Sequence, residues 1–218
     1  MARGGRRFAA ELDHLIVAAQ TLEEGEDRLE ALLGLRPRRG GTHAGMGTHN
    51  SLLGLGERCY LELIAIDPDA TTPLRPRWFE LDTAAMRASL AGGPRLIHWA
   101  ARCANIDAAR RAATIDPGTA HDMARGAFRW RITIPDDGHL PGGGVAPTLI
   151  EWPDARHPAD ALADSPLRLA SLSAAHPEPA AIRTALAALS LEDALQVTFG
   201  AKPRLAAMLK TPRGLVTL

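Results

Sequence analysis

Short apolar runs recur along the chain, separated by turns and by one or two amphipathic segments. The run ELDHLIVAA at 11–19 predicts a buried strand. Thr21, with Glu24 three residues later, is typical of a helix start, and Gly34 of its end, with leucines at helical spacing between them. Residues 42–56 predict two strands joined by a turn, and CYLELIAI at 59–66 predicts another strand. The order is strand, helix and about three strands.

The same order occurs a second time, and a third time in part. RLIHWAARC at 95–103 predicts a strand, Asn105 caps a helix through Ala113, and AFRWRITI at 127–134 and PTLIEW at 147–152 predict later strands. Residues 167–175 resemble a strand, 178–189 a helix, and the last residues predict strands again. Repetition of one supersecondary unit therefore organises the chain. We expect a first module at 11–68, a second at 94–155, and a C-terminal partial module at 165–218 packed on the same sheet.

Each full copy carries one histidine on its first strand and one glutamate on its last. His14 and His98 both lie seven residues before the predicted helix cap, and Glu62 and Glu151 lie in the closing strands. Strand alternation places His14 on the face of Ile16, away from the helix. The repeat predicts the same orientation for all four side chains, toward the concave face of a curved sheet.

An ionised glutamate in an apolar strand is costly unless it has a partner. Two glutamates and two histidines that converge would suit a divalent metal. Alternatively, each glutamate pairs with an arginine and each histidine is a hydrogen-bonded core residue. Because the pair is repeated in register, the metal site is favoured.

Four further residues are candidates for substrate contacts. His49 and Asn50 are neighbours on a middle strand, so one of them faces the concave side. His49 could bind metal or substrate, or form a strand-end hydrogen bond. Arg129 and Arg131 share a face of their strand and could hold an anionic substrate, or could pair with solvent or with nearby aspartates.

The remaining histidines and the tryptophans have simpler interpretations. The segments around His121, His139 and His157 are rich in Gly, Pro and Asp, and predict solvated loops. Core packing is expected to account for most of the tryptophans, which are Trp78, Trp99, Trp130 and Trp152.

Composition narrows the possible partners. The hydrophobic fraction is 46%, the charged fraction 23% and the net charge zero, so nothing favours binding to nucleic acid or to an anionic membrane. Two cysteines are too few for a disulfide framework. No apolar run reaches membrane-spanning length, and residues 1–8 are basic without the apolar stretch of a secretory signal. We expect a cytoplasmic protein, a monomer or a homodimer, acting on a small molecule.

Five segments resemble the vicinal-oxygen-chelate superfamily and, within it, glyoxalase-like domain proteins: DHLIVAA at 13–19, GTHN at 47–50, YLELIA at 60–65, FRWR at 128–131 and LIEW at 149–152. The resemblance implies an α+β fold in which paired βαβββ modules form a curved mixed sheet with helices on its outer face. By position, it implies that a metal is held by His14, Glu62, His98 and Glu151.

The resemblance implies a metal-dependent lyase or isomerase acting on a small substrate with two adjacent oxygens. The ion, which could be zinc, nickel, manganese or iron, would polarise the carbonyl group, and Glu151 or Glu62 would transfer the proton. A second hypothesis is a metal-free binding or resistance protein with a cup lined by aromatic and arginine side chains. A third hypothesis, an iron-dependent extradiol dioxygenase, ranks last, because that chemistry uses two histidines and one carboxylate and the predicted set has one carboxylate too many. The sequence names neither the substrate nor any glutathione site.

Overall fold

The computed structural model describes residues 9–154 and 156–218, so the basic segment at 1–8 lies outside the description. The first module contains β1 (Glu11–Ala18), α1 (Leu22–Leu33), β2 (Arg38–His43), β3 (Thr48–Gly56) and β4 (Cys59–Ile66). The second contains β5 (Arg95–Arg102), α3 (Ile106–Ala112), β6 (Thr119–Arg125), β7 (Phe128–Ile134) and β8 (Thr148–Glu151). Between them lie a short turn, η2 (Trp78–Glu80), and α2 (Ala84–Leu90). The predicted repeat is confirmed, although β6 was missed.

Local signals fix the helix ends as predicted. Thr21 Oγ1 accepts a hydrogen bond from Glu24 N at 3.2 Å, and Asn105 accepts one from Ala108 N at 2.9 Å. Gly34 ends α1 with φ of 77°, which glycine adopts without a steric penalty. Strand β6 escaped prediction because its residues, TAHDMAR, alternate weakly and are only partly buried.

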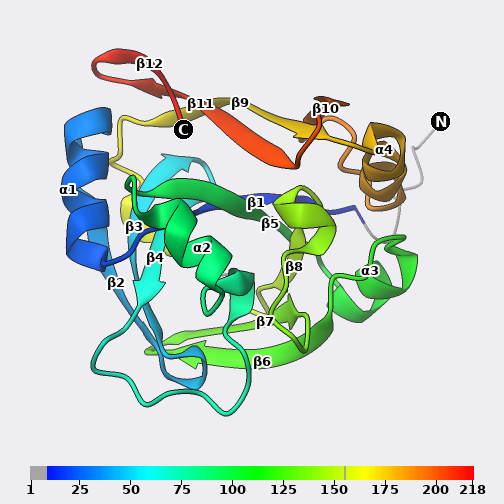
Figure 1. Cartoon of the computed structure of the whole chain (residues 1–218), viewed down its shortest axis with the longest axis horizontal. Helices are drawn as coiled ribbons and strands as arrows, with labels where there is room; N and C mark the ends of the chain where they lie inside the picture. The colour runs from blue at the N-terminus through cyan, green and yellow to red at the C-terminus, as the bar shows by residue number, and fades with distance from the viewer. Residues whose placement is uncertain (1–8, 155) are drawn as a thin grey trace.

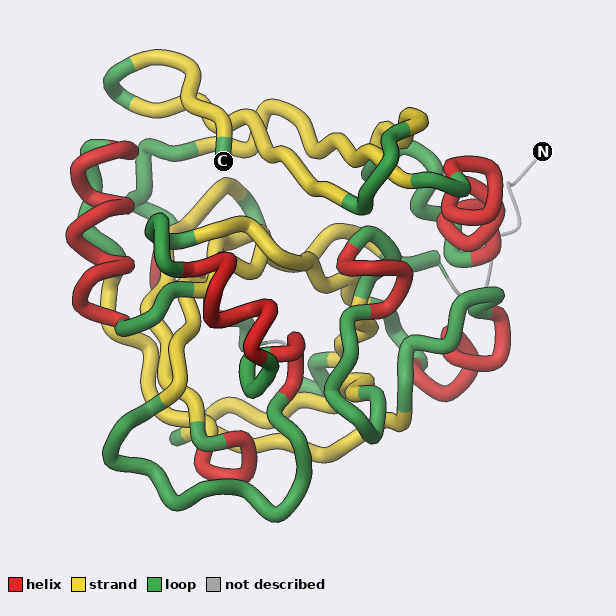
Figure 2. Tube along the Cα trace, viewed as in Figure 1, coloured by secondary structure: helices red, strands yellow, loops and turns green. Residues whose placement is uncertain are grey.

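The two modules form one curved, eight-stranded sheet in the order β2-β3-β4-β1-β5-β8-β7-β6 (Figure 1). Within each module the first strand pairs in parallel with the last, and the antiparallel pair β1–β5 joins the modules. The edge strands β2 and β6 approach each other, so the sheet curls into an almost closed trough, as the trace in Figure 2 shows.

Alternation along the strands separates two cores. Leu15, Val17 and Leu63 belong to the core on the helix side, whereas Ile16, Ala18 and Ile64 belong to the core on the concave side. These are the faces that the sequence predicts. His14 and Glu62 therefore enter the concave side from neighbouring strands.

The C-terminal segment contains β9 (Arg168–His176), α4 (Pro179–Ala188), β10 (Gln196–Phe199), β11 (Arg204–Thr211) and β12 (Gly214–Thr217). These strands form a separate four-stranded sheet, β10-β9-β11-β12, whose order differs from that of the two modules. In Figure 1 this second sheet lies across the top of the first. Its buried Leu172, Leu205 and Leu209 join the helix-side core, so the segment packs on the first sheet without extending it. No helix among the described residues is long and apolar enough to cross a membrane.

The packing of α1 on β4 yields a stability prediction. A Cβ atom added at Gly25 would lie 2.8 Å from Ala19 Cβ and 2.8 Å from Leu63 Cδ1, inside van der Waals contact. Gly25→Val should therefore lower the free energy of unfolding by about 1–3 kcal/mol, measured by urea denaturation. Gly45→Val is the control, because nothing lies within 4 Å of its added Cβ, and should change stability by less than about 0.5 kcal/mol. Equal effects at both positions would contradict this packing.

Candidate functional site

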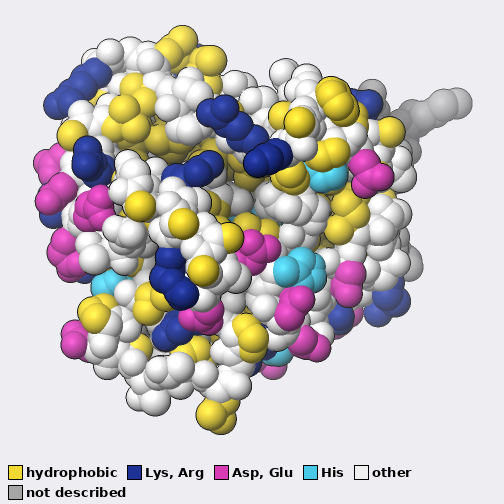
Figure 3. Space-filling model, in the orientation of Figure 1, with side chains coloured by type: hydrophobic (Ala, Val, Ile, Leu, Met, Phe, Trp, Pro, Cys, Tyr) yellow, Lys and Arg dark blue, Asp and Glu magenta, His cyan; other side chains and the backbone are white. Residues whose placement is uncertain are grey.

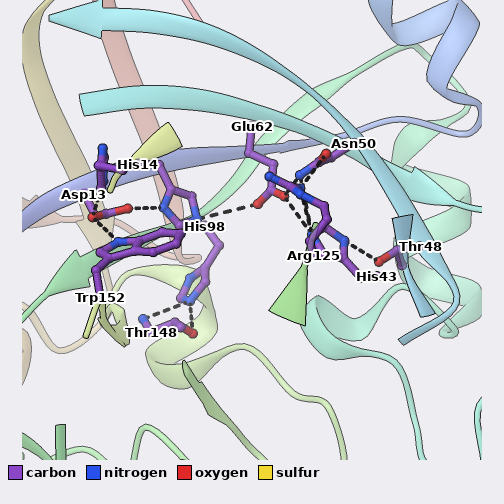
Figure 4. A network of polar contacts seen from close by, with 11 residues as sticks. Asp13, His14, His43, Thr48, Asn50, Glu62, His98, Arg125, Thr148 and Trp152 are labelled. Carbon is purple, nitrogen blue, oxygen red and sulfur yellow. Dashed lines mark hydrogen bonds and ion pairs between the residues drawn. The ribbon is translucent and has the colours of Figure 1, made fainter. Parts of the chain in front are cut away.

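The concave face of the first sheet surrounds a small cavity of about 20 Å³, which we call the cup. This volume is sufficient for about one water molecule. Its wall consists of polar and aromatic side chains, together with two isoleucines: His14, His43, Asn50, Tyr60, Glu62, Trp78, Phe79, Arg125, Trp130, Ile132, Ile150 and Trp152. The polar members come mainly from β1, β3, β4 and β6 and point toward one another (Figure 4).

His14 lies between two buried carboxylates. Its Nδ1 is 2.7 Å from Asp13 Oδ1, and its Nε2 is 3.5 Å from Glu62 Oε2. Burial alone would lower the pKa of His14, but the hydrogen bonds and charges of Asp13 and Glu62 outweigh burial and raise it to about 9. The imidazole is therefore a cation at neutral pH, with both ring nitrogens donating.

Asp13 reaches the same side of the strand as His14 because the β1–β5 pairing is interrupted between Leu12 and His14. Such a bulge breaks the alternation of side chains and is common beside functional sites. Asp13 is completely buried, and its Oδ2 accepts hydrogen bonds from Trp152 Nε1 and His157 Nε2, each at 3.0 Å. Burial raises the pKa of Asp13, but the bonds from His14 and His157 outweigh burial and lower it well below its ordinary value.

Glu62 is held from the side opposite His14 by Asn50, whose Nδ2 donates to Glu62 Oε1 at 2.5 Å. Burial raises the pKa of Glu62, but its hydrogen bond and ion pair with His14 outweigh burial and lower it to about 2. His43 Nε2 is 3.8 Å from Glu62 Oε1. Burial lowers the pKa of His43 to about 4, so this second imidazole is neutral.

Arg125 supplies the second cation of the cup. It extends from the edge strand β6 to β3, where its Nη1 donates to Asn50 Oδ1 at 2.9 Å, and it lies over the Trp130 ring at 6.0 Å. It forms no ion pair with any carboxylate in the described ranges. The cup wall thus holds one carboxylate, Glu62, and two cations, His14 and Arg125, and Asp13 behind His14 supplies the second carboxylate, so the formal charges of the network cancel.

The second module places different residues at the positions that match His14 and Glu62. Strand pairing places Glu62 beside Ile16, two residues after His14, and Thr148 beside Ala100, two residues after His98. Thr148 is therefore the structural counterpart of Glu62. His98 is fully buried: Nδ1 donates to Gly144 O at 3.0 Å, and Nε2 accepts from Thr148 N at 3.2 Å and lies 3.0 Å from Thr148 Oγ1.

The prediction that Glu151 faces the concave side is wrong. Glu151 lies three residues after Thr148, the counterpart of Glu62, and its carboxylate is on the helix side, where Oε2 accepts from Ile106 N at 2.9 Å at the start of α3. Arg131 is on the same side and pairs with Asp107 at 2.9 Å and Glu151 at 3.5 Å. An offset by an odd number of residues reverses the face of a strand residue.

The other candidate residues are divided between the two faces and the surface. Asn50 faces the cup, so one of the pair His49 and Asn50 does so, as predicted, and His49 points to the opposite side. Arg129 donates to the backbone carbonyls of residues 126 and 128 at the surface. His157, expected in solvent, is buried against Asp13. His121, also expected in a solvated loop, is on β6, with its Nε2 2.9 Å from Arg75. His139 is exposed, as predicted.

Only one of the four tryptophans is an ordinary core residue on the helix side. Trp99 is completely buried there and donates to Val145 O at 2.8 Å. Trp78, Trp130 and Trp152 line the cup instead. The Nε1 atom of Trp78 is buried and has no hydrogen-bond partner within the described residues, which leaves a donor available at the cup wall.

The four predicted metal ligands do not form a metal site. Glu151 is on the other face, and both ring nitrogens of His98 are engaged by Gly144 and Thr148. The set that remains, two histidines and one carboxylate, has the composition expected of an extradiol dioxygenase, but His98 does not present a free nitrogen to Glu62. No group of three or more His, Cys, Asp or Glu side chains in the described ranges is arranged to hold a metal ion.

Comparison with known proteins identifies the fold. The family described as "Glyoxalase-like domain" matches residues 12–190. A hypothetical protein from Staphylococcus aureus has 11% identity and a TM-score of 0.61, with 89% of this chain and 88% of that chain covered. A methylmalonyl-CoA epimerase from Mycobacterium tuberculosis has 19% identity and a TM-score of 0.40, covering 65% and 85% of the two chains. No curated protein matches.

The family match over residues 12–190 and the paired βαβββ modules define a protein of the vicinal-oxygen-chelate superfamily. The chain belongs to the glyoxalase-like domain family.

The protonated His14 yields a prediction for stability against pH. Its pKa rises from an ordinary 6.5 to about 9 on folding, so its contribution is complete below about pH 6.5 and is lost as the pH rises through about 9. The free energy of unfolding should fall over this range, measured by urea denaturation at successive pH values. Glu62→Gln removes one anionic partner, so the variant should lose less stability over the same range.

Glu151→Gln is the matched control, because Glu151 does not touch His14. It should follow the wild-type pH dependence. Identical slopes for wild type and Glu62→Gln would contradict the ion pair between His14 and Glu62.

Proposed function

We propose that this protein is a glyoxalase-type lyase or isomerase that moves a proton at a carbon atom next to a carbonyl or carboxylate group. The observation that carries the proposal is the buried Asp13–His14–Glu62 chain at the cup. A fixed cation beside a buried carboxylate offers a partner for a developing oxyanion and an acceptor for the proton. The step is assigned to side chains alone because the predicted metal ligands do not converge.

In the first step, a substrate oxygen takes the place of Glu62 Oε2 at His14 Nε2–H. Glu62 then loses the hydrogen bond that lowers its pKa, whereas burial, which raises it, remains. Glu62 therefore becomes a stronger base when substrate is bound. It accepts the proton as the C–H electron pair forms a C=C bond and the C=O π pair moves onto the substrate oxygen. Glu62 then returns the proton to the same or an adjacent atom as the C=O bond re-forms. No oxidant or reductant is needed.

Asp13 positions His14 and keeps it charged. Its carboxylate is fixed by Trp152 and His157, and Ala159 N donates to His157 Nδ1 at 3.2 Å, which leaves the proton of His157 on Nε2 facing Asp13. A buried carboxylate with three donors holds the imidazole in one orientation. We infer that the chain from Ala159 to Glu62 preorganises the oxyanion partner.

Arg125 is suited to a second, anionic part of the substrate. Its guanidinium is half-buried at the cup wall and contacts a neutral amide and a neutral imidazole. An arginine without a carboxylate partner in such a site favours a substrate carboxylate or phosphate. A small 2-oxo or 2-hydroxy carboxylate would satisfy both cations.

Substrate entry requires movement of the segment that covers the cup. Trp78 and Phe79 stack on each other, with ring centroids 5.2 Å apart, and Trp78 meets His43 edge-on at 5.0 Å. Phe79 and Glu80 both have positive φ, 60° and 58°, a conformation that costs of order 1–3 kcal/mol for such residues. This strain favours a covering segment that can open.

Deuterium exchange tests the proposal. Wild-type protein is incubated in D₂O with small 2-oxo and 2-hydroxy carboxylates and 1,2-dicarbonyl compounds, and loss of the α-proton signal is followed by NMR. Glu62→Gln should slow exchange by about 10²- to 10⁴-fold, because it removes the acceptor. Exchange should also slow as the pH rises through about 9, where His14 loses its proton.

Glu151→Gln is the control for this experiment, and it should exchange at the wild-type rate. Exhaustive chelation should leave the rate unchanged. A rate that collapses on chelation and returns with a divalent ion would overturn the metal-free step, and full activity in Glu62→Gln would overturn the role of Glu62.

A second candidate, a metal-free binding protein, is favoured by the wall of the cup. Three tryptophans, one phenylalanine and Arg125 surround the cavity, and aromatic and arginine side chains suit binding of a planar anion. This alternative predicts that a ligand binds wild type and Glu62→Gln alike and is recovered unchanged from both.

A further inference from the structure

A second and larger cavity lies outside the cup. It has a volume of about 720 Å³ and lies where β1 ends and β5 begins, between α1, α2 and the C-terminal sheet. The two cavities share no lining residue. A volume of several hundred Å³ is typical of pockets that bind small molecules.

Apolar side chains form much of the wall of this cavity, including Val17, Leu29, Leu96, Ile97 and Leu205. Leu32 of α1 also lines it and is 44% exposed, one of few large hydrophobic side chains so exposed within the described residues. Figure 3 shows this face, with hydrophobic side chains in a hollow below the C-terminal sheet and basic side chains beside it. An exposed apolar hollow of this kind suits an apolar ligand.

Three arginines make the hollow positive. Arg28, Arg95 and Arg204 line the cavity, from α1, β5 and β11, and no acidic side chain does. Their guanidinium groups form no ion pair or hydrogen bond within the described ranges, whereas surface arginines such as Arg36 and Arg39 pair with glutamates of α1. The whole chain has zero net charge, so this concentration of unpaired cations is local. An anion here would relieve their mutual repulsion.

We propose that this cavity binds an acyl chain that ends in a carboxylate, with the chain on the leucines and the carboxylate among Arg28, Arg95 and Arg204. The apolar wall and the positive rim together select an amphipathic anion over an uncharged apolar molecule or a small hydrophilic anion. Arginine is the cation best suited to bind a carboxylate through two parallel hydrogen bonds. This site is independent of the reaction proposed for the cup.

Calorimetric titration with decanoate, below its micelle concentration, tests this site. Wild type should bind decanoate, and decanol, which has the same chain without the charge, should bind at least tenfold more weakly. The triple variant Arg28→Ala, Arg95→Ala, Arg204→Ala should also bind decanoate at least tenfold more weakly. All three side chains are exposed, so the variant is expected to fold, and thermal unfolding checks this.

Two controls locate the binding. Arg111→Ala removes an exposed arginine of α3 that does not line the cavity, and should leave the affinity for decanoate unchanged. Glu62→Gln should also leave it unchanged, because decanoate does not enter the cup; a changed affinity there would place the ligand in the cup and overturn the proposal. Equal affinity of wild type and the triple variant, or equal affinity for decanol, would also overturn it. Failure of the wild type to bind decanoate would overturn the proposal too. This includes the case in which a second copy of the chain covers the hollow and the protein elutes as a dimer.

Discussion

The placement of one buried imidazole between two buried carboxylates constrains the rest of the cup. An uncompensated charge in the interior is strongly destabilising, so Asp13 and Glu62 persist there only with cations beside them. His14 meets both carboxylates, and Arg125 balances the remaining charge from the far edge strand. The curvature of the sheet is what brings β6 close enough to β3 for this contact. The curvature of the sheet and the charge balance among Asp13, His14, Glu62 and Arg125 therefore depend on each other.

The two modules share a fold but not a chemistry. Both open with a histidine on the first strand, yet Glu62 faces His14, whereas Thr148 occupies the corresponding place near His98. His98 is a neutral, fully bonded core residue, since burial lowers its pKa to about 4. The carboxylate that the sequence assigned to the second module, Glu151, instead accepts a hydrogen bond from Ile106 N at the start of α3. The cup is thus asymmetric, with its reactive groups supplied mainly by the first module.

The fold could be predicted because helix caps and strand periodicity are local signals, and they placed most elements and the faces of His14 and Glu62. The face of Glu151 could not, because YLEL and LIEW both have glutamate in third place, whereas strand pairing matches Glu62 with Thr148, three residues before Glu151. An offset by an odd number of residues reverses the face, and the likeness of the two motifs conceals it. Asp13 was missed because a bulge reverses the expected alternation. Arg125 and His157 were missed because their partners lie far away in the sequence, and only the closed fold brings them together.

The charge balance of the cup depends most on the protonation of His14. Nitrogen NMR of the histidine side chains at pH 7.5 measures it directly, with His14→Gln used to assign the signals. We predict that both ring nitrogens of His14 carry protons at this pH, whereas His43 and His98 are neutral. A His14 ring with one unprotonated nitrogen at pH 7.5, titrating near its ordinary pKa of 6.5, would contradict the charge balance on which the cup and its proposed chemistry rest.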